Sequence, residues 1–144
     1  RPVIDRIACP WLVARFIDKE PEFLFVPPDR VVAAAEETGA IPYDVPGVEL
    51  THVGDGCSFD AFVAKYDLDR DPAIKTIAAI VRGADTDRHD LTPQSAGLLA
   101  ISMGLRDLTP DDQEVLKHGF VIYDALYAWA SQRQAETHNW PPAA

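Results

Sequence analysis

Apolar residues recur at intervals of three and four over much of the chain, which is the period of an α-helix rather than of a strand. Beyond residue 70, three helices are predicted, and each follows a capping residue and a proline: Asp71-Pro72, Thr92-Pro93 and Thr109-Pro110. The last of them carries a broad apolar face that includes Leu126, and Thr109 is its expected cap. These three helices are expected to form the core.

The first third of the chain mixes shorter helical and extended patterns. Helices are predicted from Cys9-Pro10 to Asp18, over 30–38 before Gly39, and over 58–64 with Ser58 as the cap. Short apolar runs bounded or interrupted by prolines predict strands at 22–26, 41–45 and 48–53.

The predicted fold class is therefore α+β and helix-dominant, with about five or six helices packed with two or three short strands from the N-terminal third. A single domain is expected over residues 1–134, followed by a frayed C-terminal tail over 135–144, where the apolar pattern is lost.

Composition and charge exclude several classes of function. The chain has 144 residues, enough for one core, and 47% of them are hydrophobic, as in an ordinary globular protein. A formal net charge of −10 argues against nonspecific binding to nucleic acid or to an anionic membrane surface. Because no apolar run is long enough to span a bilayer and no secretion signal is visible, we expect a cytosolic location. Cys9 and Cys57 are then expected to be reduced thiols, with a disulfide as the alternative.

The densest charge lies at residues 82–90, RGADTDRHD, between two apolar segments. Such charge cannot be buried without partners. One interpretation is a solvated turn between helices with internal ion pairs, as is common for loops. The other is that Arg82 and Asp85 supply polar groups to a site where the helices meet.

His52 and Cys57 flank the turn Gly54-Asp55-Gly56, and an imidazole and a thiol are both suitable ligands for zinc or iron. Two other interpretations of Cys57 remain. It is either a small buried apolar side chain or a reactive thiol activated by the N-terminus of the helix that follows it.

Asp124 lies among apolar residues of the last helix, so it is expected either to pair with an arginine or to bind a metal. Arg6, Arg15 and Arg82 each adjoin apolar sequence. They are interpreted as salt-bridge partners or as the guanidinium groups of an anion-binding pocket.

These separate polar groups are expected to converge on shared partners, because burying any one of them alone would cost several kcal/mol of free energy. The metal hypothesis takes His52, Asp85 and Asp124 as ligands of one transition-metal ion, zinc or iron, with Arg82 behind them. A charged triad closed on itself is the alternative explanation.

Four phrases in the same order resemble the C-terminal domain of the chromate-resistance ChrB family over about residues 1–129: DRIACPWL from residue 5, CSFD from 57, IVRGAD from 80 and YDALYAW from 123. The resemblance implies a domain that accompanies a chromate efflux transporter and acts in chromate-responsive regulation. It also implies a regulatory or sulfurtransferase-like partner domain in relatives.

The leading hypothesis is a cytosolic chromate-resistance accessory or sensor domain. It would bind an oxyanion or a metal ion in a pocket between the 82–90 stretch, the 52–57 turn and the last helix, and would not itself bind nucleic acid or a membrane. A small metal- or thiol-dependent redox enzyme is the alternative, and a structural interaction domain without a ligand is the second alternative. The sequence leaves open whether the chain is an enzyme.

Overall fold

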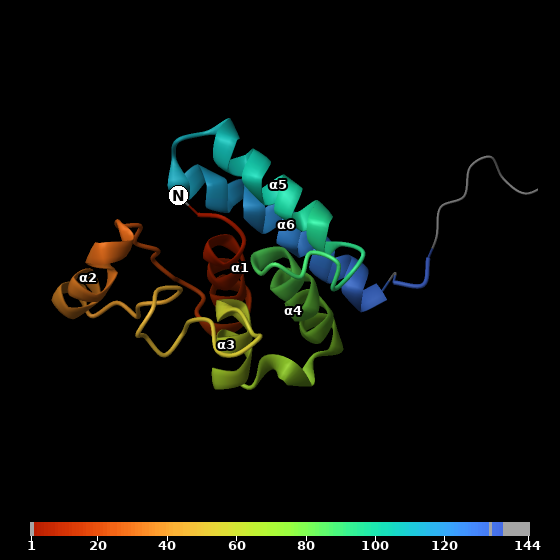
Figure 1. The fold of residues 1–144 in the computed structure, drawn as a ribbon, viewed down its shortest axis with the longest axis horizontal. Coiled ribbons are helices and arrows are strands. Elements are labelled where there is room, and N and C mark those ends of the chain that lie inside the picture. The colour runs from red at the N-terminus through yellow and green to blue at the C-terminus, as the bar shows by residue number, and fades with distance from the viewer. Residues whose placement is uncertain (1, 133, 137–144) are drawn as a thin grey trace, which may run out of the picture.

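The computed structural model describes residues 2–132 and 134–136, and this part of the chain contains six α-helices joined by turns and irregular segments. Figure 1 shows α4 beside α1 in the middle of the molecule, with α5 and α6 side by side along one flank and α2 set apart at the opposite end. The helices are α1 (Asp5–Leu12), α2 (Val31–Thr38), α3 (Ser58–Lys65), α4 (Pro72–Asp85), α5 (Ser95–Leu108) and α6 (Asp112–Gln132).

The centre of the core is α4, which packs against α1, α3, α5 and α6. Its predicted start is confirmed, because the Asp71 carboxylate accepts a hydrogen bond of 2.9 Å from the backbone N–H of Ala73 and Pro72 takes the first helical position. Ile74, Ile77 and Val81, spaced three and four apart, are completely buried. Burial of such side chains stabilises a fold by about 1.5–3 kcal/mol each.

Two glycines allow the helices to approach closely. A Cβ at Gly119 of α6 would collide with the side chain of Ile7 in α1, so the absence of a side chain lets these two helices meet. At Gly83 of α4, a Cβ would collide with the Ser95 side chain at the start of α5. Ser95 Oγ also donates to the carbonyl of Ile80 at 3.0 Å, which fixes the start of α5 on α4.

The predicted α+β class is wrong, because the described residues contain helices but no β-strand. Segments 22–26, 41–45 and 48–53 are irregular, and their only ladder contacts within this described part are two isolated bridges, Tyr43 with Leu50 and Val53 with Gly56. The prolines that bound or interrupt these runs remove backbone donors and prevent pairing over any length. The carbonyl of Phe23 instead accepts from Gln113 Nε2 at 2.9 Å, a side chain of α6.

Several predicted boundaries also need correction. α1 begins at Asp5, so that Pro10 lies inside the helix instead of opening it, and a π-helical turn, Val13–Ile17, continues it. At the longest helix, Asp111 replaces Thr109 as the cap, because its Oδ1 accepts from the backbone N–H of Gln113 at 2.9 Å. The N-terminal flank of α3 is Cys57, with Ser58 as the first helical residue. The frayed tail predicted over 135–144 lies outside the described residues from 137 onward.

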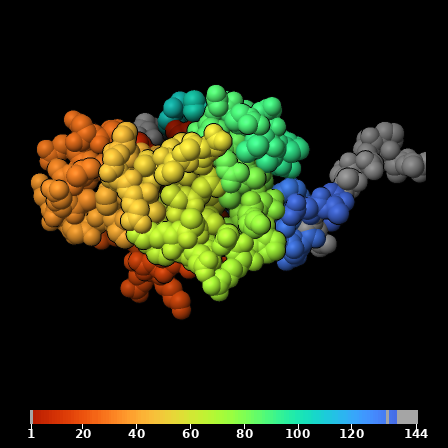
Figure 2. Space-filling view, turned by 60° about the horizontal axis from the view of Figure 1, so that its bottom comes forward, coloured from red at the N-terminus to blue at the C-terminus, as the bar shows by residue number. Residues whose placement is uncertain are grey.

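Residues 18–41, which we call the arm, contact the helical body through Phe23 and Phe25, which pack against the core. They form a lobe at one end of the molecule, coloured orange in Figure 2. Among the helices and helical turns of the described residues, α2 packs only on the 3-10 turn before it, Pro28–Arg30, and none of its residues is buried. None of the helices in the described ranges combines the length and the apolar character needed to cross a membrane.

Candidate metal centre

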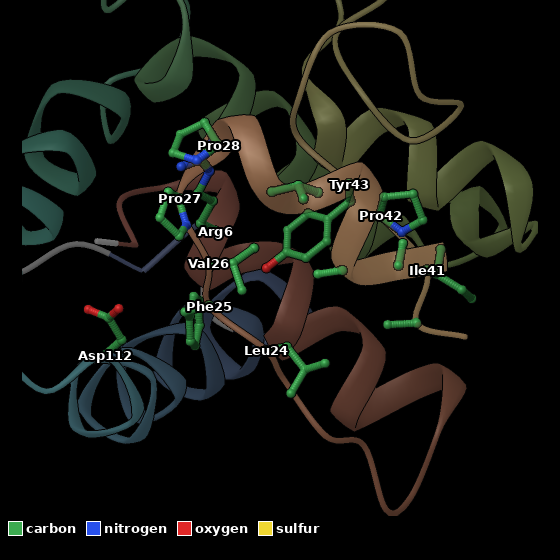
Figure 3. A pocket seen from close by; sticks show the side chains of 14 residues that line it. Arg6, Leu24, Phe25, Val26, Pro27, Pro28, Ile41, Pro42, Tyr43 and Asp112 are labelled. Carbon is green, nitrogen blue, oxygen red and sulfur yellow. The ribbon is translucent and has the colours of Figure 1, made fainter. Parts of the chain in front are cut away.

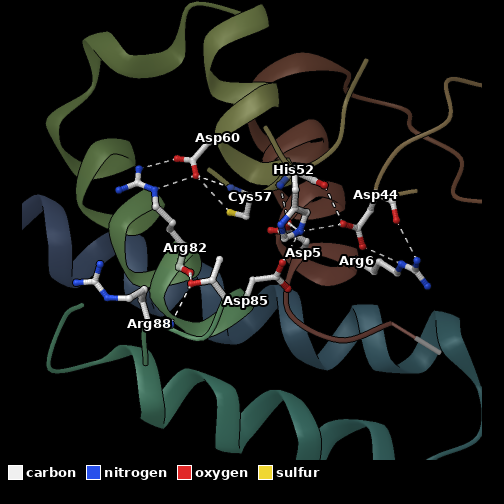
Figure 4. Close-up of polar contacts among 11 residues, drawn as sticks. Asp5, Arg6, Asp44, His52, Cys57, Asp60, Arg82, Asp85 and Arg88 are labelled. Atoms are coloured by element: carbon white, nitrogen blue, oxygen red, sulfur yellow. Dashed lines mark hydrogen bonds and ion pairs between the residues drawn. The ribbon is translucent and has the colours of Figure 1, made fainter. Parts of the chain in front are cut away.

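Four side chains from separate segments meet beside α1 and α4: Asp5, Asp44, His52 and Asp85 (Figure 4). Each offers one ligand atom, and these atoms all lie within 4.8 Å of one another. We call these four residues the acidic cluster. Asp5 is the first residue of α1 and Asp85 the last residue of α4, whereas Asp44 and His52 belong to the irregular segment between α2 and α3.

The backbone around the cluster is strained at two positions. Ile4, which immediately precedes Asp5, has φ 48° and ψ −97°, and Asp44 has φ 58°. A positive φ is exceptional for a β-branched residue such as isoleucine and persists only where the surrounding packing enforces it. Ile4 is buried in the core. This packing fixes where Asp5 enters its helix.

His52 is the point on which the carboxylates converge. Its Nε2 lies 2.8 Å from Asp85 Oδ2, 3.5 Å from Asp5 Oδ2 and 3.6 Å from Asp44 Oδ1. The His52 side chain is 42% exposed, whereas that of Asp5 is not exposed at all. The cluster is therefore closed on the protein side and open toward solvent at His52.

Asp5 is the most unusual member of the cluster. Its Oδ2 accepts a hydrogen bond of 2.7 Å from the backbone N–H of Ser58, but its Oδ1 is buried and has no hydrogen-bond partner among the residues that the structure describes. Burial, followed by the nearby charges of Asp85 and Asp44, raises the pKa of Asp5 well above its ordinary value. Burial also raises the pKa of Asp85. Two ionised carboxylates so close together need either a shared proton or a cation between them.

Asp44 is held from two sides. Arg6 donates from Nε to Asp44 Oδ2 at 2.9 Å and from Nη2 to the Asp44 carbonyl at 3.0 Å, and Ser58 Oγ donates to Oδ1 at 2.8 Å. Arg6 thus contributes one guanidinium to the cluster, against three carboxylates. These contacts orient Asp44 but leave the site short of positive charge.

A metal ion would suit the chemistry of this donor set. Ligand atoms around one ion with bonds of about 2 Å lie within about 4 Å of each other, so the cluster needs only a slight contraction to enclose one. One imidazole nitrogen with carboxylate oxygens is a donor set used for zinc and iron in proteins. The exposed side at His52 leaves room for water or another small ligand to complete the coordination.

The structure brings together two of the three ligands predicted from the sequence. His52 and Asp85 are in contact, whereas Asp124 is bound elsewhere. Asp124 Oδ1 accepts from Trp11 Nε1 at 2.8 Å and from Arg15 Nε at 2.9 Å, and its Oδ2 accepts from Arg15 Nη2 at 3.0 Å. These bonds satisfy the carboxylate in place of a metal.

The last helix instead approaches the cluster through Tyr123. The Tyr123 hydroxyl is buried without a hydrogen-bond partner, and burial raises its pKa, with Asp5 as the next largest cause.

Each of the three arginines proposed as anion ligands is paired with a carboxylate. Arg6 binds Asp44 and Arg15 binds Asp124, as described above. Arg82 grips Asp60 with two hydrogen bonds, Nε to Oδ2 at 3.0 Å and Nη2 to Oδ1 at 2.7 Å (Figure 4). This is the salt-bridge interpretation left open by the sequence. The bonds already made occupy Nε and Nη2 of each guanidinium, so an oxyanion could bind without competition through Nη1 alone.

The surroundings of Cys57 oppose the activation expected at a helix N-terminus. Its side chain is buried, and Sγ donates to Asp60 Oδ2 at 3.4 Å. Burial, together with the charges of Asp5 and Asp60, raises the pKa of the Cys57 thiol, so that the unreactive thiol form is favoured. Cys9 and Cys57 are both free and buried.

Sequence reasoning missed Asp5 and Asp44. Asp5 precedes Cys9 and Leu12 by four and seven residues, so it shares the buried face of α1, and a charged residue on such a face was a usable signal. Asp44 stands between Pro42 and Pro46 in an irregular segment, where no periodicity indicates which way a side chain points.

Comparison with known proteins agrees with the resemblance noted in the sequence. The family described as "ChrB, C-terminal domain" matches residues 1–130. Protein ChrB from Cupriavidus metallidurans is 30% identical over 124 residues, which make up 86% of this chain and 37% of that protein. The chain thus spans little more than a third of the length of this relative. No solved structure matches the chain.

Proposed function

Because the chain belongs to the family of ChrB C-terminal domains, which have a role related to chromate resistance, we propose that it is a metal-binding accessory or sensor domain. The acidic cluster holds the ion, with Asp5, Asp44, His52 and Asp85 as ligands. The ion, rather than an oxyanion, is the primary ligand, because three carboxylates repel an anion. The domain works in the cytosol beside a regulatory or sulfurtransferase-like partner domain and does not itself contact nucleic acid.

One observation carries this proposal. Asp5 Oδ1 is a buried carboxylate oxygen without a hydrogen-bond partner, and its neighbours in the cluster are other carboxylates and His52. A buried charge of this kind is normally paired or bound to a metal. A cation at the centre of the cluster supplies the missing partner and relieves the repulsion between Asp5, Asp44 and Asp85.

Zinc and iron are the candidates that the donor set favours, because imidazole and carboxylate ligands suit both. Arg6 then orients one of the metal ligands without binding the ion itself, since its two hydrogen bonds hold Asp44 in place. A transition-metal ion bound in this way could report on the metal or redox state of the cell, which is what a sensor domain requires.

The experiment is elemental analysis of the purified protein after loading with zinc or iron(II) and removal of free metal. We expect about one ion per chain in the wild type, and a large loss of bound metal in His52→Ala and Asp85→Asn with an unchanged helical circular dichroism signal. His118→Ala is the matched control, because His118 lies on α6 and contacts Glu114 outside the cluster. Equal metal content in the wild type and in both cluster variants would contradict the proposal.

The exposure of His52 favours one alternative, a metal-dependent redox enzyme, because an open coordination position admits a substrate. Repeated turnover of chromate by the metal-loaded protein with a thiol reductant would establish the enzyme. Stoichiometric metal binding without turnover would leave the accessory or sensor function. A thiol-dependent enzyme is disfavoured by the buried, protonated state of Cys57.

A further inference from the structure

A cavity of about 380 Å³ lies between the arm and the helical body, and Arg6 is among the residues that line it (Figure 3). This volume is at the lower end of the range of small-molecule sites, about 300–1,000 Å³, so the cavity fits a compact ligand. One wall is the arm, from Leu24 to Pro28 together with Val31 and Ala35. The other wall is formed by Arg6, Tyr43 and Asp112.

Most of the cavity wall is apolar and incompletely covered. Leu24, Val26 and Ile41 all line it and are 47%, 37% and 59% exposed. A cluster of exposed large apolar side chains in a concave surface indicates a binding site more often than isolated exposed residues do. The body of the ligand should therefore be an aliphatic or aromatic group that fills this space.

Two donors stand at one part of the wall. Tyr43 directs its hydroxyl toward Val26 across the cavity (Figure 3), and this hydroxyl makes no hydrogen bond within the described residues. Arg6 uses Nε and Nη2 on Asp44, which leaves Nη1 with no partner in the same part of the chain. A guanidinium and a phenol hydroxyl together recognise a carboxylate.

An acceptor without a partner stands at the start of α6. Asp112 lines the same cavity, and its Oδ1 is buried and makes no hydrogen bond to the described part of the chain. A carboxylate in this position would repel a simple anion, but it would be satisfied by a ligand that also carries an ammonium group.

We infer that this cavity binds a free apolar amino acid, with its carboxylate at Arg6 and Tyr43, its ammonium group at Asp112 and its side chain against Leu24, Val26 and Ile41. The zwitterion matches the donors and the acceptor, and the apolar walls cover the side chain. This site is separate from the acidic cluster and does not depend on a bound metal.

The test is calorimetric titration of the metal-free protein with three probes of similar shape: L-leucine, 4-methylpentanoate, which lacks the ammonium group, and 3-methylbutylamine, which lacks the carboxylate. We expect L-leucine to bind and each of the other two to bind at least about tenfold more weakly, because each leaves a charged group of the site unpaired. No detectable binding of L-leucine, or equal binding of 4-methylpentanoate, would overturn the inference.

Two substitutions check that binding occurs in this cavity. Tyr43→Phe and Asp112→Asn each alter a group that has no hydrogen-bond partner within residues 2–132 and 134–136, so the fold should be kept while the affinity for L-leucine falls about tenfold. Tyr66→Phe and Asp69→Asn are the matched controls, since neither residue lines this cavity. L-leucine binding that is unchanged in both cavity variants would place the amino acid elsewhere and overturn the inference.

Discussion

Figure 4 shows carboxylates in two different environments: Asp60, which is paired with an arginine, and the acidic cluster. Asp60, on α3, is gripped by two hydrogen bonds from Arg82, so its charge is neutralised by the protein itself. The acidic cluster gathers three carboxylates and one imidazole, and the cation that the protein binds to it from outside is the guanidinium of Arg6. Asp60 is therefore paired within the protein, whereas the carboxylates of the cluster outnumber the cationic groups bound to them.

This difference indicates that the Arg82–Asp60 pair and the acidic cluster have different roles. A carboxylate–guanidinium pair stabilises the fold modestly and is complete without a ligand. Burial, and after it the nearby charges of Asp85 and Asp44, raise the pKa of Asp5, so the ionised form of this carboxylate raises the free energy of the folded state. Ionisable side chains with strongly shifted pKa values are concentrated at functional sites. The following predictions test whether the cluster behaves as a cation site and the pairs as structure.

The largest expected effect comes from adding the cation. Free zinc at about a hundred times its dissociation constant should raise the free energy of unfolding of the wild type by about 2.7 kcal/mol, because the ion binds only the folded state. His52→Ala should lose most of this gain, whereas His118→Ala should keep it. Chemical denaturation with and without zinc measures the effect. An equal gain in all three proteins would place the zinc outside the cluster.

The second prediction concerns the cost of the cluster without metal. Asp5→Asn keeps the acceptor for the Ser58 N–H but removes a buried charge, so the metal-free variant should be more stable than the wild type by about 1–3 kcal/mol. The same variant should gain little from zinc. Thermal and urea unfolding in the presence of a chelator measure the first effect. A less stable Asp5→Asn protein would mean that the cluster is already compensated without a cation.

Breaking the Arg82–Asp60 pair should lower the stability of the protein, whereas Asp5→Asn should raise it. Arg82→Met keeps the apolar stem of the side chain but removes the partner of Asp60, so it should destabilise the protein by about 1–2 kcal/mol whether or not zinc is present. Arg70→Met is the control, because the Arg70 side chain is 82% exposed. Urea unfolding compares the two variants. Loss of zinc binding in Arg82→Met would show that the two regions are coupled rather than separate.

The helical part of the fold was largely readable from the sequence. Asp71-Pro72 and the spacing of Ile74, Ile77 and Val81 predicted α4 correctly, because local capping and one buried face agree there. Segments 22–26 and 41–45 were wrongly predicted as strands, since short apolar runs become strands only where a partner strand exists. In this fold those runs pack against helices or line a cavity.

The site was only partly predictable for a related reason. His52 and Asp85 were identified as polar groups among apolar sequence, and the structure places them in contact. Asp124 had the same sequence context but meets Arg15 and Trp11, and local sequence does not reveal which partner a helix face will meet. Asp5 was missed although it lies on the buried face of α1, and Asp44 was missed because it lies in an irregular segment, at a positive φ angle that no local pattern predicts.

The smallest predicted effect is a pH dependence at Asp124, a paired carboxylate nearer to solvent. Hydrogen bonds from Arg15 are the main cause that lowers its pKa, so the folded protein holds the ionised form more tightly than the unfolded chain does. A lowered pKa contributes stability at pH values above the ordinary value of about 3.9, and this contribution is lost as the pH falls below it. Since the Asp124 side chain is 46% exposed, Asp124→Asn should cost only about 0.5 kcal/mol at pH 7. The difference from the wild type, measured by urea unfolding from pH 7 downward, should shrink as Asp124 becomes protonated. The exposed variant Asp69→Asn should show no comparable trend. A difference that grows toward acid pH would require a raised pKa at Asp124, which is the behaviour of Asp5 and not of a carboxylate held by arginine.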